Sequence, residues 1–230
     1  MPNVLIAGAS RGIGLGLAAR YLDLGHTVYA LLRNPGAAAE LNDLARQHPD
    51  RLKLIEADIT ASDVLPRIEA SLGGARLQRL IVNAGISQPT VSNLFELTDE
   101  QTARLFTTNA IAPIRLAQGL ADRLEDGGVA AFMSSQMGSV GLALSARIPL
   151  YGASKAALNS MMQSWVAQQG ELRFSVLALH PGWVRTDMGG SGADISVDES
   201  VQGLVDTIEG YAGEQARCAF VDYQDRTLAW

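Results

Sequence analysis

The sequence has little charge, few aromatic residues and a single cysteine. Charged residues make up 18% and aromatic residues 6% of the 230 residues, and Cys218 is the one cysteine. A lone cysteine cannot form an intrachain disulfide, so its presence does not indicate an oxidising compartment. The net charge of −6 argues against a nucleic-acid-binding protein, because phosphate binding needs a basic surface.

Long apolar runs are missing as well. No stretch approaches the roughly 18 apolar residues of a membrane helix. The chain enters the apolar run Val4–Ala7 without the basic segment of a signal peptide. We therefore expect a cytoplasmic protein that has neither a membrane nor a nucleic acid as its partner. His26, His48 and His180 are scattered along the chain and predict no metal site.

What the sequence does contain is an alternation of short apolar runs and longer amphipathic runs. The apolar runs are Val4–Ala7, Thr27–Leu32, Leu52–Glu56, Leu80–Asn83, Val129–Met133, Phe174–Leu179 and Cys218–Val221. Predicted helices between them include Ile13–Leu24, Thr98–Leu124 and Tyr151–Gln169. Near-continuous apolar runs are typical of strands that are buried on both faces. The pattern therefore predicts one α/β domain over residues 1–230, with a parallel sheet covered by helices on both sides.

A glycine-rich loop follows the first predicted strand. It reads Gly8-Ala9-Ser10-Arg11-Gly12-Ile13-Gly14 and leads directly into a helix. In such a loop, backbone N–H groups at the positive end of a helix can bind a pyrophosphate. The loop therefore predicts a nucleotide-binding site, although a tight turn with a purely structural role is the alternative.

The end of the second predicted strand indicates which dinucleotide binds. An NAD-binding protein would place an acidic residue there for the ribose 2′-hydroxyl, but this chain has Arg33. Arg33 and Arg11 could both bind a 2′-phosphate through charge-assisted hydrogen bonds, so we expect NADP(H) rather than NAD(H). Two solvated surface arginines are the alternative. Asp58, before Ile59, could accept a hydrogen bond from the adenine amino group or cap a helix.

Tyr151 and Lys155 form a Tyr-x-x-x-Lys pair on one face of a predicted helix. A phenol with its ordinary pKa of about 10 transfers protons poorly at neutral pH. Lowering that pKa to about 7 requires about 4 kcal/mol. One cation about 4 Å away supplies this energy at an effective dielectric constant of about 20. We therefore expect Lys155 to lower the pKa of Tyr151.

These motifs occur in one order along the chain, and together the sequence resembles the short-chain dehydrogenase/reductase family. The matching residues are Gly8–Gly14, Asp58, Asn83-Ala84-Gly85, Asn109, Ser134-Ser135, Tyr151 with Lys155, and Pro181-Gly182-x-Val184-x-Thr186. Ser134–Val140 and Ser154–Asn159 resemble the C-factor and Sniffer-type carbonyl reductases most. The resemblance implies a doubly wound Rossmann sheet of about seven parallel strands.

The resemblance also implies a role for each matching residue in hydride transfer between NADP(H) and a carbonyl or alcohol substrate. The implied catalytic residues are Tyr151 as general acid and base, Lys155, Ser135 and Asn109. Lys155 would hold the nicotinamide ribose, Ser135 would polarise the carbonyl, and Asn109 would hold a water. The implied cofactor-binding residues are Gly8, Ser10, Arg11, Gly12, Ile13, Gly14, Arg33, Asp58, Ile59, Asn83, Ala84, Gly85, Tyr151, Lys155, Pro181, Gly182, Val184 and Thr186.

The sequence offers more than one candidate for the catalytic serine. Ser134, Ser135 and Ser139 are all candidates, and the Ser-x-x-Gly step that ends at Gly138 favours Ser135. Ser135 lies 16 residues before Tyr151, which is three more than the family usually has. Ser139, 12 residues before Tyr151, is the second choice.

The substrate is expected to contact the loops at residues 136–150 and 187–195. The first loop supplies an apolar wall and one cation, namely Leu142, Leu144, Ile148, Leu150 and Arg147. The glycine-rich segment Met188–Asp194 is expected to be a mobile lid over a fairly open pocket. Trp183 lines the pocket or packs beneath it, and Trp230 contacts the pocket or a neighbouring subunit.

Two further expectations concern partners. The two long predicted helices form a homodimer or homotetramer face in similar proteins. The alternative function is an NADP(H)-binding sensor that acts through a protein partner with little turnover, because a fold alone does not establish an activity.

Overall fold

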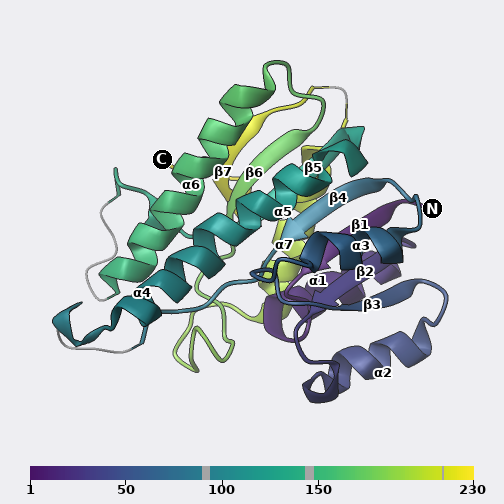
Figure 1. The fold of residues 1–230 in the computed structure, drawn as a ribbon, viewed down its shortest axis with the longest axis horizontal. Coiled ribbons are helices and arrows are strands. Elements are labelled where there is room, and N and C mark those ends of the chain that lie inside the picture. Colours follow the sequence, from purple (N-terminus) through teal and green to yellow (C-terminus); the bar gives the residue numbers. More distant parts are fainter. Residues whose placement is uncertain (90–93, 143–147, 214) are drawn as a thin grey trace.

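The computed structural model describes residues 1–89, 94–142, 148–213 and 215–230. Its centre is one sheet of seven parallel strands in the order β3-β2-β1-β4-β5-β6-β7 (Figure 1). The strands are β1 (Asn3–Ala7), β2 (Thr27–Leu32), β3 (Leu52–Glu56), β4 (Leu77–Val82), β5 (Leu124–Met133), β6 (Ser175–His180) and β7 (Cys218–Asp222). This order confirms the predicted doubly wound Rossmann fold.

Helices cover both faces of this sheet (Figure 1). They are α1 (Gly12–Asp23), α2 (Ala39–Gln47), α3 (Val64–Leu72), α4 (Asp99–Phe106), α5 (Ala112–Leu120), α6 (Pro149–Gln169) and α7 (Val197–Gly210). Buried residues of α3, α5 and α6 form the core on one face, and buried residues of α1, α2 and α7 form the core on the other.

The strands contribute to both cores, as near-continuous apolar sequences predict. In β1, Leu5 and Ala7 belong to one core, and Val4 and Ile6 belong to the other. Alternate side chains of a strand point to opposite faces, so a strand between two helix layers needs apolar residues at every position. The strand therefore supports both helix layers at once.

The region around β5 differs from the prediction. A helix was expected to run to Leu124, but Leu124 already pairs with Leu77 as the first residue of β5. Gly127, with φ of +75°, makes an irregularity in this pairing, and its carbonyl accepts a hydrogen bond from Gly213. Left-handed backbone of this kind favours glycine. Consecutive glycines occur both in turns and in β-bulges, so the sequence alone does not distinguish the two.

Helix α4 begins as expected at Thr98, whose hydroxyl accepts a hydrogen bond from the backbone of Gln101 at 3.2 Å. Gln101 returns a bond to the backbone of Thr98, which completes a capping box. The expected single helix is interrupted by a π-helical turn at Thr107–Ile111 before α5 begins. Turns of this type bend a helix and often occur at functional sites.

The chain reverses its direction of winding between β1 and β4. Both neighbours of β1 are parallel to it, and the connections that leave β1 and β4 go to opposite sides of the sheet. This arrangement opens a crevice at the carboxyl ends of the strands, where ligands of such folds bind. In the described part of the chain, no helix is long and apolar enough to span a bilayer.

Candidate active site

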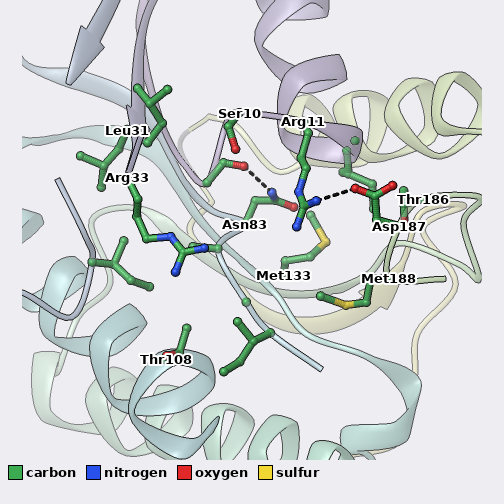
Figure 2. A pocket seen from close by; sticks show the side chains of 18 of the residues that line it. Ser10, Arg11, Leu31, Arg33, Asn83, Thr108, Met133, Thr186, Asp187 and Met188 are labelled. Atoms are coloured by element: carbon green, nitrogen blue, oxygen red, sulfur yellow. Dashed lines mark hydrogen bonds and ion pairs between the residues drawn. The ribbon is translucent and has the colours of Figure 1, made fainter. Parts of the chain in front are cut away.

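A cavity of about 640 Å³ lies at the carboxyl ends of the strands. It is lined by most of the residues that the sequence predicts to bind a cofactor (Figure 2). These are Gly8, Ser10, Arg11, Gly12, Ile13, Arg33, Asp58, Ile59, Asn83, Ala84, Gly85, Tyr151, Lys155, Pro181 and Thr186. Gly14, Gly182 and Val184 are not among the lining residues. The site is therefore assembled from loops that follow several different strands.

The glycine loop lets three backbone segments pack closely. A Cβ atom on Gly8 would lie 2.7 Å from the Cα of Ala84, and one on Gly14 would collide with the carbonyl oxygen of Gly8. Gly8 has φ of +85° and Gly12 has φ of +53°, so both adopt left-handed backbone. Asn83 donates a side-chain hydrogen bond to the same Gly8 carbonyl at 2.8 Å (Figure 2).

The start of α1 faces this cavity. Arg11 holds the N-cap position of α1, but its side chain does not cap the helix. The first turn, Gly12–Leu15, contains no acidic residue. Backbone N–H groups at a helix start without a side-chain cap are free to bind an anion, and the helix dipole favours negative charge there. The loop therefore fits a pyrophosphate.

The two predicted phosphate-binding arginines differ in their surroundings. Arg11 forms an ion pair with Asp187 at 2.5 Å, whereas Arg33 reaches over the cavity and lies 4.0 Å from Asp58 (Figure 2). Asp58 also accepts two hydrogen bonds from Thr60 through its other oxygen, Oδ1. Asp58 therefore orders its own turn, which is the local role that the sequence left open. Arg33 is the cation more available to a ligand.

Tyr151 and Lys155 lie on α6, beside the turn that contains Ser135. The Ser135 hydroxyl accepts a bond from the backbone of Met137 at 3.1 Å and lies close enough to Tyr151 to lower the pKa of that phenol. Lys155 is buried, and its Nζ donates to the carbonyl of Met133 at 2.7 Å. The backbone N–H of Tyr151 donates to the buried Gln88 at 2.9 Å, which ties the first turn of α6 to the strand β4 side of the site.

The charge state of this pair corrects one expectation. Burial raises the pKa of Tyr151 to about 12, and the hydrogen bond with Ser135 opposes that rise. Burial also lowers the pKa of Lys155 to about 8. The predicted lowering of the Tyr151 pKa by Lys155 is therefore not found. The Lys155 Nζ lies 5.8 Å from the centre of the Tyr151 ring. Desolvation outweighs attraction between the two groups.

The structure separates the two candidate serines. Ser139 is buried, and its hydroxyl accepts a bond from the backbone of Leu142 and faces the carbonyl of Trp230. Both of these hydrogen bonds of the Ser139 hydroxyl are therefore made to residues other than Tyr151. Of the two, Ser135 is the one that acts on the pKa of Tyr151. This arrangement favours Ser135 as the group that acts together with the tyrosine.

Asn109 is fully buried in the π-helical turn. Its side-chain oxygen accepts a bond from the backbone N–H of Ile86, and its amide donates to the Ile86 carbonyl, both at 2.8 Å. The amide also donates to Ser154 at 3.0 Å. Asn109 thus joins the π-helical turn to the segment after β4 and to α6. The expected water at this residue stays a prediction.

The segment after β6 is held by hydrogen bonds at several points. The buried Val184 forms a parallel bridge to Ile195, and the Arg185 side chain donates to the carbonyls of Ala193 and Asp194. The indole N–H of Trp183 donates to Gly189 at 2.9 Å. The segment that was expected to be a mobile lid is thus fastened at both ends.

Several residues of the cavity escaped sequence reasoning. They are Leu31, Leu32, Glu40, Ala57, Thr60, Ile86, Ala103, Arg104, Thr107, Thr108, Met133, Arg185 and Val197. Thr107 and Thr108 come from the π-helical turn, where a regular helix would have placed its side chains differently. Their position next to Asn109 was the only available signal.

Part of the predicted substrate wall can be placed. Leu142 and Val140 are exposed, and the Trp230 ring packs against Phe220 in a tilted arrangement with 5.4 Å between ring centres. The carbonyl of Trp230 accepts a bond from the backbone of Gly141, so Trp230 supports the loop after Ser139. Leu144 and Arg147 lie outside the described residues.

A family model described as short chain dehydrogenase matches residues 2–195. The chain belongs to that family. A carbonyl reductase from Pseudomonas aeruginosa PAO1, in a crystal structure in complex with NADP, is 53% identical, with a TM-score of 0.94 and 100% of both chains covered. Carbonyl reductase Sniffer of D. melanogaster is 31% identical, with a TM-score of 0.89 and 100% of both chains covered.

A third similar protein is the C-signal of Myxococcus xanthus. It is 35% identical over 153 residues, which cover 66% of this chain and 91% of that protein. The predicted resemblance to short-chain dehydrogenases of the C-factor and Sniffer type is therefore confirmed.

Proposed function

We propose that this short-chain dehydrogenase is a carbonyl reductase that uses NADPH and converts a ketone or aldehyde to an alcohol, with the reverse reaction also possible. The observation that carries the proposal is the placement of Tyr151 and the buried Lys155 in the lining of the glycine-loop cavity, with Ser135 acting on the Tyr151 pKa. The NADP complex of the similar P. aeruginosa carbonyl reductase supports it.

The glycine loop and the start of α1 would bind the pyrophosphate of the cofactor. Arg33 would bind the 2′-phosphate, and Arg11 would do so after leaving Asp187. Asp58 and Ile59 would border the adenine, and Asn83-Ala84-Gly85 would line the adenosine ribose. Lys155 would hold the nicotinamide ribose. Pro181, Val184 and Thr186 would lie near the carboxamide.

The bound cofactor would supply the hydride, and this chain's own residues would handle the proton. A phenol with a pKa of about 12 is protonated at neutral pH, so Tyr151 is available as the acid for carbonyl reduction. Ser135 and Tyr151 would both donate hydrogen bonds to the substrate oxygen as negative charge develops on it. The positive charge of Lys155, close to the ring, would stabilise the phenolate that remains after proton transfer.

A fluorescence titration with NADPH and with NADH tests the cofactor. We expect NADPH to bind tighter by about tenfold or more, which is about 1.4 kcal/mol. Arg33→Ala should remove most of this preference and leave NADH binding unchanged, because NADH lacks the 2′-phosphate. Equal binding of both cofactors by the unmodified protein would contradict the proposal.

Consumption of NADPH with a panel of ketones and aldehydes tests the reaction. Tight NADPH binding without turnover on any carbonyl would instead support a sensor. The cytoplasmic location and the homodimer or homotetramer stay predictions.

A further inference from the structure

Asn159 lies one turn after Lys155 on α6 and is buried. Its side-chain oxygen accepts a hydrogen bond from the Ser134 hydroxyl at 2.7 Å. Its amide points at the carbonyl of Gly138, 3.5 Å away. Asn159 therefore contacts the chain immediately before Ser135 and again three residues after it. The proposed mechanism assigns no role to this buried amide.

The turn between these two contacts is short and rigid. Residues Gln136–Gly138 form one 3-10 turn, which Ser135 caps through its hydroxyl, and the backbone of Gly138 donates to the Ser135 carbonyl at 2.8 Å. A Cβ on Gly138 would lie 2.8 Å from the backbone of Lys155. The turn consequently packs directly on α6, with no side chain between the two backbones.

The beginning of the turn is anchored from the other side as well. The backbone N–H of Ser134 donates to the carbonyl of Leu179 in β6, so the sheet fixes the position of the Ser134 backbone. The Ser134 side chain then has one remaining partner on α6, which is Asn159. An unpaired buried hydroxyl costs free energy, so this bond defines where the turn sits along the helix.

We infer that Asn159 is a positioning residue that fixes the Ser135 hydroxyl relative to Tyr151. The inference rests on the proposed function. Asn159 and Tyr151 belong to the same helix. The contacts of Asn159 with Ser134 and Gly138, which we call the bracket, therefore hold Ser135 and Tyr151 in one rigid unit. Small displacements of a group in such a pair reduce the rate strongly.

A double-mutant cycle tests this inference through turnover. Asn159→Leu keeps the size and apolar surroundings but removes both polar contacts. We expect it to lower kcat by about tenfold and to leave the Kd for NADPH within about twofold, because Asn159 acts on the proton-donating pair. In a Ser135→Ala background the same substitution should lower kcat by less than about twofold, since the residue it positions is gone.

Two further variants keep the test informative. Ser134→Ala removes the hydroxyl that donates to Asn159 and changes the volume less. It should reproduce the loss of kcat, and it replaces Asn159→Leu if that variant does not fold. Ser160→Ala, at the exposed neighbouring position on α6, is the matched control and should behave like the unmodified protein.

The outcomes are distinguishable. An equal loss of kcat in both backgrounds would show that Asn159 acts on the fold and not through Ser135, and would overturn the inference. Unchanged kcat in Asn159→Leu and Ser134→Ala would also overturn it. If the unmodified protein reduces no carbonyl with NADPH, the proposed function fails, and this failure is seen before any variant is compared. The melting temperature then tests the two hydrogen bonds of Asn159 by itself: a raised Tm in Asn159→Leu would contradict their role in holding the turn.

Discussion

Two sites in the described part of the chain place a tyrosine near a buried cation, and they are arranged in different ways. At the amino end of the sheet, Arg79 binds Glu209 through two hydrogen bonds of 2.9 and 2.5 Å, and Tyr21 donates to the same carboxylate at 3.0 Å. At the carboxyl end, Tyr151 and Lys155 lie together, and among the described residues no carboxylate pairs with Lys155.

The difference shows in the charge of each group. Burial would raise the pKa of Glu209, but the bonds from Arg79 hold it below its usual value, so the first site keeps a balanced ion pair. Burial lowers the pKa of Lys155 to about 8, because no opposite charge offsets its desolvation. A balanced pair can contribute to stability, whereas an unbalanced buried cation costs stability and is suited to a chemical role.

Removing each tyrosine hydroxyl should give the largest contrast. Tyr151→Phe is expected to lower kcat by about 1,000-fold, or about 4 kcal/mol, because the proton donor is lost. Tyr21→Phe should keep full turnover and lose about 1 kcal/mol of stability with its bond to Glu209. Steady-state kinetics and urea unfolding measure the two effects. Turnover that survives in Tyr151→Phe would contradict the assignment of the acid.

Replacing the unbalanced cation should stabilise the protein. Lys155→Met is expected to abolish turnover and to raise the free energy of unfolding at pH 7 by up to about 3 kcal/mol, since the folded-state penalty of the charge disappears. The unfolded chain holds the proton up to its ordinary pKa of 10.5, while the folded chain releases it near 8. The unmodified protein therefore recovers stability as the pH rises from about 8 to about 10.5.

Urea unfolding of both proteins at pH 7 and at pH 10 checks this expectation. The advantage of Lys155→Met should be largest at the lower pH and should shrink at the higher one. An advantage that does not change with pH would mean that packing, and not charge, is responsible.

Breaking the balanced pair should have the smaller and opposite effect. Glu209→Gln leaves Arg79 buried without its carboxylate and is expected to cost about 2 kcal/mol of unfolding free energy, less than a fully buried pair would, because Glu209 is partly exposed. Turnover per folded molecule should not change. Asp63→Asn, which breaks the exposed pair with Arg67 on α3, is the matched control and should change little.

Local patterns in the sequence predicted much of this molecule. The limits of β2 and β3 followed from short, mostly apolar runs, and the Tyr151–Lys155 spacing placed both side chains on one helix face. These features depend on neighbours in sequence. Predicting them therefore required no knowledge of distant segments.

The parts that failed depend on contacts between distant segments. The glycine of the β5 irregularity is explained by Gly213 and Leu77, which no local pattern reveals. Likewise, the direction of the Tyr151 pKa follows from how much protein surrounds it and not from Lys155 alone. Arg11 was predicted from its place in the glycine loop, but its partner Asp187 lies 176 residues away.

The contact between Gly138 and the backbone of Lys155 has a consequence for how this enzyme can change. Since α6 begins at Pro149, the chain leaves this helix surface after Gly138 and returns to it before Tyr151. Both ends of the segment between Gly138 and Pro149 therefore contact or belong to α6. Lengthening a tethered segment costs little, about 0.6 kcal/mol for each doubling. We therefore expect a longer segment there to leave the contact between Gly138 and Lys155 in place.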